Sequence, residues 1–252
     1  MAVERRKLLW GAAALGMAPP LPGLAATVLP PSPAPQSGLS DLSRQLAALP
    51  RRRQFTTVPR LLDHPDLWDD VAFDALLAYR GAQKMLGTGT ALSGNWPNEA
   101  QNLLNSEVFS FVHPDALLVM ALWGEAQLGL YNEAAWAHFD LARLVSPGQT
   151  AMPLHQTPAG SSRHHQDEQG AYGAAGRSIP ALQARGVVFL ACHNAVWAHA
   201  GRLIALGAGP AGLTQEQLAA ELTNALDPRA IVTPSALGAL AELQRAGFSR
   251  IF

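Results

Sequence analysis

The chain has 252 residues, a formal net charge of −1, and 15% charged against 48% hydrophobic residues. This length fits one domain with an appendage. The near-neutral charge argues against a nucleic-acid-binding protein, which would carry a basic face.

The N-terminus has the order of regions found in a secretory signal. A basic start is followed by an apolar run, Leu8–Ala18, and then by small residues. The run is too short for a membrane span, which needs about 20 apolar residues. Arg5 and Arg6 predict a twin-arginine-like signal over residues 1–26, although Glu4 stands where Ser or Thr is usual, so an ordinary export signal stays open. We therefore expect a periplasmic or otherwise exported protein with no membrane span in the mature chain.

Residues 27–69 are predicted to form a proline-rich tether and an irregular lead-in. The segment "PPSPAP" favours extended polyproline conformation and packs poorly as helix or sheet. The triple arginine Arg51–Arg53 is interpreted as a solvated charge run without chemistry. The folded domain is expected to begin at about residue 70 and to extend to residue 252.

Short apolar runs bounded by turn residues predict the strands. They are Phe73–Gly81, Asp115–Gly124, Gly186–Cys192, "AIVTP" and "FSRIF". Continuous apolar runs of this length are typical of strands buried on both faces of a parallel sheet.

Helical segments alternate with these runs. They are expected in 95–112, in "SIPALQARG", after Cys192, in "TQEQLAAELTNAL" with a capping box from Thr214 and Gln217, and in "PSALGALAELQRAG". The alternation predicts an α/β fold, a mostly parallel sheet of about five strands covered on both faces. Ligands of such sheets bind at the carboxyl ends of the strands.

Two loops carry weaker signals. A long loop over 145–177 has almost no apolar periodicity, so it is a candidate lid or partner contact. Its His164, His165 and Asp167 are of metal-ligand types, but we interpret them as solvated and predict no metal site. The segment Gly87–Gly94 lacks the lysine and spacing of a phosphate loop and is interpreted as a strand-to-helix loop.

Cys192 is the only cysteine and ends the third apolar run, directly before a helix. Helix N-termini offer free N–H donors and positive potential, which favour a thiolate. His199 lies about 10 Å along the same helix face, too far for a direct Cys–His pair. A buried cysteine acting as a small apolar residue is the alternative.

Three segments together resemble the DsrE/DsrF-like family of sulfur-handling proteins. They are "HPDALLVMALWGEAQLGLY", "GVVFLACHNAVWAHA" and "IVTPSALGALAELQRAGFSRIF", within residues 70–252. The resemblance implies a three-layer α/β sandwich, a trimer or hexamer, and in some members a cysteine that relays persulfide sulfur. The N-terminal extension, the loop 145–177 and "WGEA" depart from the family pattern.

Two functions follow as hypotheses. The first is a thiol-based sulfur carrier or sulfurtransferase-like protein that uses Cys192 with a sulfur donor or acceptor protein. Glu125, expected at the carboxyl edge of the neighbouring strand, and His193 and Asn194, which follow the thiol, are its candidate binding residues. The second is a non-catalytic, oligomeric binding or partner module in which Cys192 is buried and structural. No cofactor fingerprint is visible, and a single cysteine cannot form an internal disulfide.

Overall fold

The structure is a computed structural model that describes residues 38–252. The predicted signal over residues 1–26 and the first part of the predicted tether lie outside the described residues.

Five parallel strands form a single sheet, which confirms the α/β class. In chain order they are β1 (Lys84–Gly89), β2 (Leu117–Leu122), β3 (Val188–Cys192), β4 (Ile231–Thr233) and β5 (Ser249–Arg250). Their order across the sheet is β4-β3-β2-β1-β5, and every neighbouring pair is parallel. All six residues of β2 are buried, as expected for a central strand with both faces covered.

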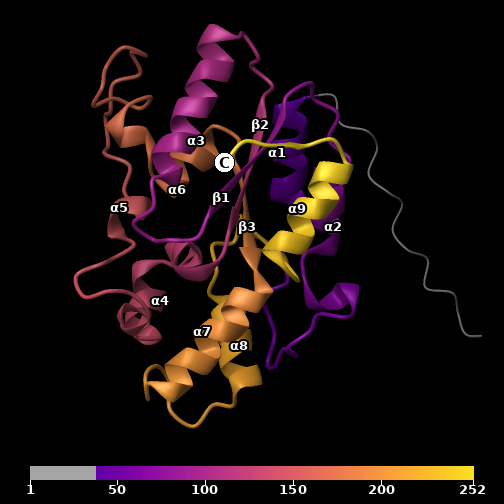
Figure 1. Ribbon diagram of the computed structural model, residues 1–252, viewed down its shortest axis with the longest axis vertical. Coiled ribbons are helices and arrows are strands. Elements are labelled where there is room, and N and C mark those ends of the chain that lie inside the picture. Colours follow the sequence, from indigo (N-terminus) through magenta and orange to yellow (C-terminus); the bar gives the residue numbers. More distant parts are fainter. Residues whose placement is uncertain (1–37) are drawn as a thin grey trace, which may run out of the picture. The chain divides into compact units, whose positions relative to one another are not determined.

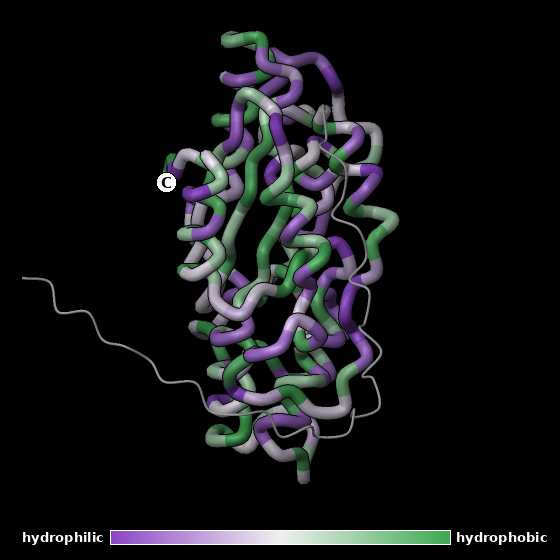
Figure 2. Tube along the Cα trace, turned by 90° about the vertical axis from the view of Figure 1, so that its right-hand side faces the viewer, coloured by the Kyte–Doolittle hydropathy of each residue, from purple (hydrophilic) through white to green (hydrophobic). Residues whose placement is uncertain are grey.

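Helices cover the two faces of the sheet and make a three-layer arrangement (Figure 1). One face is covered by α1 (Leu39–Ala48), α2 (Asp70–Leu77) and α9 (Ala236–Arg245). The other is covered by α3 (Trp96–Asn105), α6 (Ile179–Ala184), α7 (His193–Ala205) and α8 (Gln215–Asn224). Short helices α4 (Glu133–His138) and α5 (Met152–His155) lie in the connection between β2 and β3. Each face encloses its own apolar cluster, and the strands between them are hydrophobic along much of their length (Figure 2).

The predicted strand Phe73–Gly81 is wrong, because this segment belongs to helix α2 and the turn after it. The buried residues of α2, Ala72, Phe73, Ala75 and Leu76, recur at helical spacing on one face. The segment is also built from alanine and leucine rather than β-branched residues, so its propensity favours a helix.

The first strand is β1, and it includes glycines that were interpreted as part of a loop, Gly87–Gly94. Gly87 is needed inside the sheet, because a Cβ there would collide with Sδ of Met120 and lie 2.6 Å from the ring of Phe252. Only the residues after Gly89 form the strand-to-helix loop.

The folded domain begins well before residue 70, and helix α1 stands where residues 39–48 were predicted to be tether, whereas most of the lead-in after it is irregular as predicted. Helix α1 packs against α2 and buries Leu42 and Leu46 in the same cluster as Leu76. The leucine spacing of four residues, which places both side chains on one helix face, explains this packing.

The triple arginine is also not a solvated run. Arg53 forms a 3.0 Å ion pair with the buried Asp69, and its Nη2 donates to the carbonyl of Ala230. Asp69 in turn accepts the N–H of Val232 at 2.7 Å and donates its own N–H to the carbonyl of that residue. The lead-in thereby occupies polar groups of the edge strand β4, which would otherwise be free to pair with another chain.

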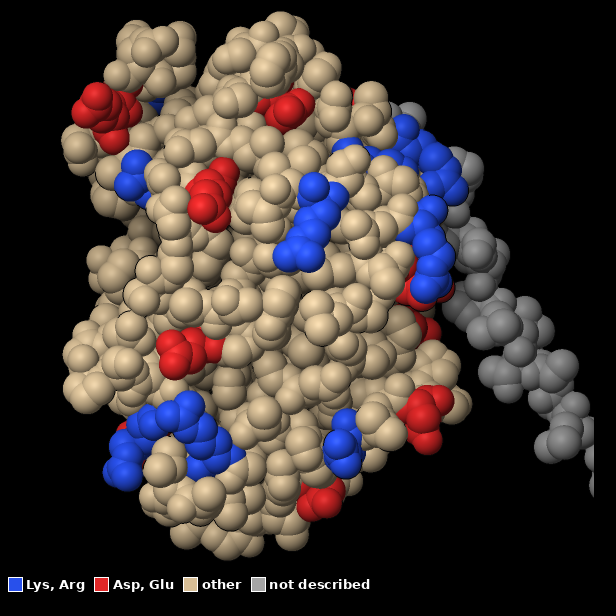
Figure 3. Space-filling view, viewed as in Figure 1, with Lys and Arg blue, Asp and Glu red and all other residues tan. Residues whose placement is uncertain are grey.

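The other expected strands and helices are found, whereas the short helices α4 and α5 were not predicted. Strands β2 to β5 fall within the expected runs, and the capping box of Thr214 and Gln217 is present at the start of α8. On the surface shown in Figure 3, acidic and basic side chains are scattered among uncharged ones. Within residues 38–252, no helix is long and apolar enough to cross a membrane.

Candidate functional site

Cys192 lies where it was expected, at the junction of β3 and α7. It is the last residue of β3 and the N-cap residue of α7, with extended backbone dihedrals, but its side chain does not cap that helix. Instead Sγ accepts a hydrogen bond from the N–H of Ala236, the first residue of α9, at 3.3 Å. The thiol therefore faces the α2 and α9 layer.

The Cys192 side chain is almost fully buried, whereas a sulfur carrier would need an accessible thiol. Cys192 is only 5% exposed and belongs to the apolar cluster that contains Leu190, Ala195 and Ile231. Cys192 lines none of five surface cavities found among residues 38–252. Little of the Cys192 side chain is therefore open to a reagent in solvent.

Gln127, which the sequence analysis missed, contacts Cys192 from the segment that follows the neighbouring strand β2. Its Oε1 accepts the backbone N–H of Cys192 at 2.7 Å, and the side chain is fully buried. Gln127 lies in a 3₁₀ segment, Gly124–Leu130, that follows β2. Because β2 and β3 are paired, with Leu122 opposite Ala191, this segment reaches the end of β3.

Glu125, the residue predicted for this position, lies in the same 3₁₀ segment and is half-buried. Among the described residues its carboxylate makes no hydrogen bond or ion pair with Cys192. The sequence places two polar residues, Glu125 and Gln127, in the stretch after this buried strand, and it does not show which of them is buried.

A second buried polar group lies near Gln127. Nε2 of Gln127 and the hydroxyl of Tyr131 are both buried, and neither has a hydrogen-bond partner within residues 38–252. Burial raises the pKa of Tyr131, and a side-chain interaction with Gln127 opposes this rise. Burial, the larger effect, therefore keeps the phenol neutral.

The other two predicted binding residues differ in exposure: His193 is buried and Asn194 is exposed. His193 is buried, and its Nε2 pairs with the carbonyl of Pro59 at 2.9 Å, so it fastens the lead-in to the start of α7. Burial lowers its pKa, which favours the neutral ring. Asn194 is exposed on the other side of the helix and no described side chain bonds to it.

His199 lies two turns along α7 and does not pair with the thiol. It is buried, and burial together with the charge of Arg202 lowers its pKa to about 4. Its Nδ1 has no partner among the described residues. The ring is therefore a neutral core group at physiological pH rather than a base for Cys192.

The loop 145–177 is fixed to the domain at several points. Asn105 of α3 donates to the carbonyl of Tyr172 at 2.8 Å, and His155 pairs with the carbonyl of Gly129 at 2.8 Å. The ring of Phe109 stacks on His165 and meets Tyr172 edge-on. Residues 38–252 hold no group of three or more His, Cys, Asp or Glu side chains arranged for a metal ion.

The groups described around the end of β3 are thus a buried thiol, two buried histidines with lowered pKa values and a buried glutamine. Comparison of the chain with protein-family models, with curated proteins and with solved structures found no match.

Proposed function

We propose that this protein is an exported, non-catalytic binding and partner module in which Cys192 is a structural residue. The observation that carries the proposal is the burial of the thiol, 5% exposed and held by the N–H of Ala236. A spare exposed thiol is a liability in an oxidising compartment, whereas a buried one is inert. We also propose the DsrE/DsrF-like family and a homo-oligomer, both from sequence resemblance and in keeping with a parallel α/β sheet.

An exposed apolar segment after α3 supports the partner-binding part of this proposal. Phe109, Phe111 and Val112 are 44%, 62% and 73% exposed. Val112 also has a φ of 58°, a conformation that a β-branched residue rarely adopts. Strain and exposed apolar area in the same segment are typical of contact surfaces. Sedimentation of Phe111→Ser tests this: it should lower self-association, and an unchanged distribution would remove the assignment of this segment.

The sulfur-carrier function is the second candidate, and one observation favours it. The sulfur faces the N-terminus of α9 and lies at the N-terminus of α7, and both positive helix ends would stabilise a persulfide anion. Transfer would require α9 to open, since the thiol is covered.

Addition of polysulfide separates the two functions. In the binding-module function, the folded protein gains no sulfur by intact-mass measurement, and Cys192→Ser behaves like the parent chain. Addition of one sulfur to the folded parent chain but not to Cys192→Ser would establish the carrier function instead.

Export is proposed from Arg5 and Arg6. Replacing both with lysine should leave the precursor in the cytoplasm, because twin-arginine receptors read both guanidinium groups. Undiminished export of that variant would indicate the general secretory route.

A further inference from the structure

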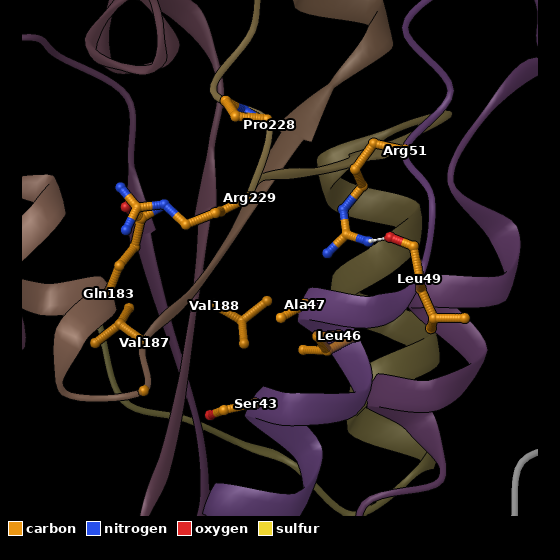
Figure 4. A pocket seen from close by; sticks show the side chains of 11 residues that line it. Ser43, Leu46, Ala47, Leu49, Arg51, Gln183, Val187, Val188, Pro228 and Arg229 are labelled. Atoms are coloured by element: carbon orange, nitrogen blue, oxygen red, sulfur yellow. Dashed lines mark hydrogen bonds between the residues drawn. The ribbon is translucent and has the colours of Figure 1, made fainter.

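A cavity of about 320 Å³ lies between helix α1 and the beginning of strand β3 (Figure 4). This is the opposite end of β3 from Cys192, because Val188 lines the cavity and Cys192 ends the strand. Its volume is at the lower end of the range for small-molecule sites, about 300–1000 Å³.

The walls of the cavity are mainly apolar. Leu46, Ala47 and Leu49 come from α1 and the residue after it, and Val187 and Val188 come from the start of β3. An aliphatic group placed between these side chains would be removed from water, which favours binding by the hydrophobic effect.

Arg51 supplies a cation to this apolar cavity. Its Nε donates to the carbonyl of Ala230 at 3.3 Å, and one Nη donates to the carbonyl of Leu49 at 3.0 Å. Figure 4 shows the second terminal nitrogen turned toward the cavity. The two bonds to carbonyl groups fix the guanidinium in this orientation.

Arg51 is also the one member of the triple arginine that forms no ion pair with a described residue. Arg52 pairs with Asp66 and Asp70, and Arg53 pairs with Asp69. Burial lowers the pKa of Arg51, with Asp69 and Asp227 opposing this from a distance. A half-buried cation without a counter-ion is costly, and a carboxylate placed against it would relieve that cost.

The other charged groups nearby do not compete for this position. Arg229 lines the far side of the cavity, and its Nε lies 3.6 Å from Asp227. The carboxylate of Asp227 also accepts from Gln183 at 3.1 Å and from the N–H of Arg229, so it is already occupied and does not line the cavity.

We propose that this cavity binds a small amphipathic carboxylate, with the carboxylate on Arg51 and an aliphatic body between α1 and β3. The inference rests on the proposed binding function and names a ligand class for it. The experiment on this cavity does not involve Cys192, so it tests the ligand site independently of the role of the thiol.

The experiment titrates the full chain with sodium octanoate and follows the methyl resonances of Leu46, Leu49 and Val188 by NMR. We expect saturable shifts confined to these residues. 1-Octanol has the same tail without a charge and should bind at least about tenfold more weakly than octanoate. Inorganic phosphate should produce no shift. Absence of saturable shifts with octanoate, or equal binding of octanol, would overturn the proposal.

Three variants locate the site. Arg51→Gln should weaken octanoate binding by about tenfold or more, and Arg51→Lys should retain most of it. Arg44→Gln removes an exposed arginine of α1 that does not line the cavity and should leave binding unchanged. Unaltered binding by Arg51→Gln would contradict the role of the guanidinium.

Because Arg51 also bonds to Ala230, its replacement can disturb folding. Ala47→Trp provides an independent test, since Ala47 is exposed on α1 and a tryptophan there fills the cavity without touching those bonds. It should abolish the shifts while circular dichroism stays unchanged. Full binding by this variant would place octanoate elsewhere and overturn the site.

Discussion

The backbone N–H of Cys192 donates a 2.7 Å hydrogen bond to Oε1 of the buried Gln127. This contact joins the end of β3 to the 3₁₀ segment after β2, across the carboxyl edge of the sheet. The only cysteine of the chain is thus held on two sides, by Gln127 at its backbone and by Ala236 at its sulfur.

Replacing Gln127 by methionine should destabilise the protein. Methionine has a similar shape but cannot accept the N–H of Cys192, and an unsatisfied buried donor costs about 1–3 kcal/mol. Chemical denaturation measures the loss as a lower free energy of unfolding. Gln166→Met, at an exposed position of the long loop, is the matched control and should change it little. Equal stability of both variants would mean that the Gln127 contact contributes nothing.

Asp69 should be the most sensitive acidic residue of the lead-in. It is 2% exposed and accepts from the N–H of Arg52, the N–H of Val232 and Nη1 of Arg53. Asp69→Ala leaves the arginine unpaired beside the edge strand, which costs about 3–5 kcal/mol when such a pair is buried. Asp66→Ala breaks only exposed pairs, with Arg52 and His64, and should cost less than about 1 kcal/mol. A small effect at Asp69 would contradict the anchoring of β4 by the lead-in.

His199 should make stability depend on pH. Its pKa is lowered from 6.5 to about 4 in the folded state. Between pH 6.5 and pH 4 the ring is therefore protonated in the unfolded chain and mostly neutral in the folded protein. The free energy of unfolding is therefore unaffected by this group above pH 6.5 and falls as the pH drops toward 4, by at most about 3 kcal/mol. Denaturation at a series of pH values measures the slope.

The variant His199→Gln removes this titration and should flatten the slope between pH 6.5 and 4. A remaining slope is expected, because burial also lowers the pKa of His193. The exposed His138→Gln should keep the slope of the parent chain. If His199→Gln kept it too, the ring would be protonated as readily in the folded state as in the unfolded one.

The sequence predicted the sheet well where strands were long and fully apolar. β2 and β3 fell within their expected runs, because strands buried on both faces read as continuous apolar segments bounded by turn residues. It failed at β1, whose glycines look like a loop until the ring of Phe252 is known to pack against Gly87. It failed also at α2, where a short apolar run is equally compatible with a buried helix.

At the candidate site the position of Cys192 was predictable, and its surroundings were not. The distance between strands β2 and β3 in the sequence gives no register, so Glu125 and Gln127 could not be told apart. The apolar cluster that buries the thiol contains side chains of α9 and of α1, a helix in a segment that was expected to be a tether. Contacts with both helices are long-range, and local sequence patterns do not encode them.

The most direct test of the central claim is the rate at which Cys192 of the folded protein reacts with a thiol reagent. Intact-mass measurement after treatment with N-ethylmaleimide should show no adduct on the native chain and one adduct after unfolding. The buried sulfur, 5% exposed and bonded to the N–H of Ala236, accounts for that difference. Rapid stoichiometric labelling of the native protein, absent in Cys192→Ser, would contradict the structural role of this cysteine.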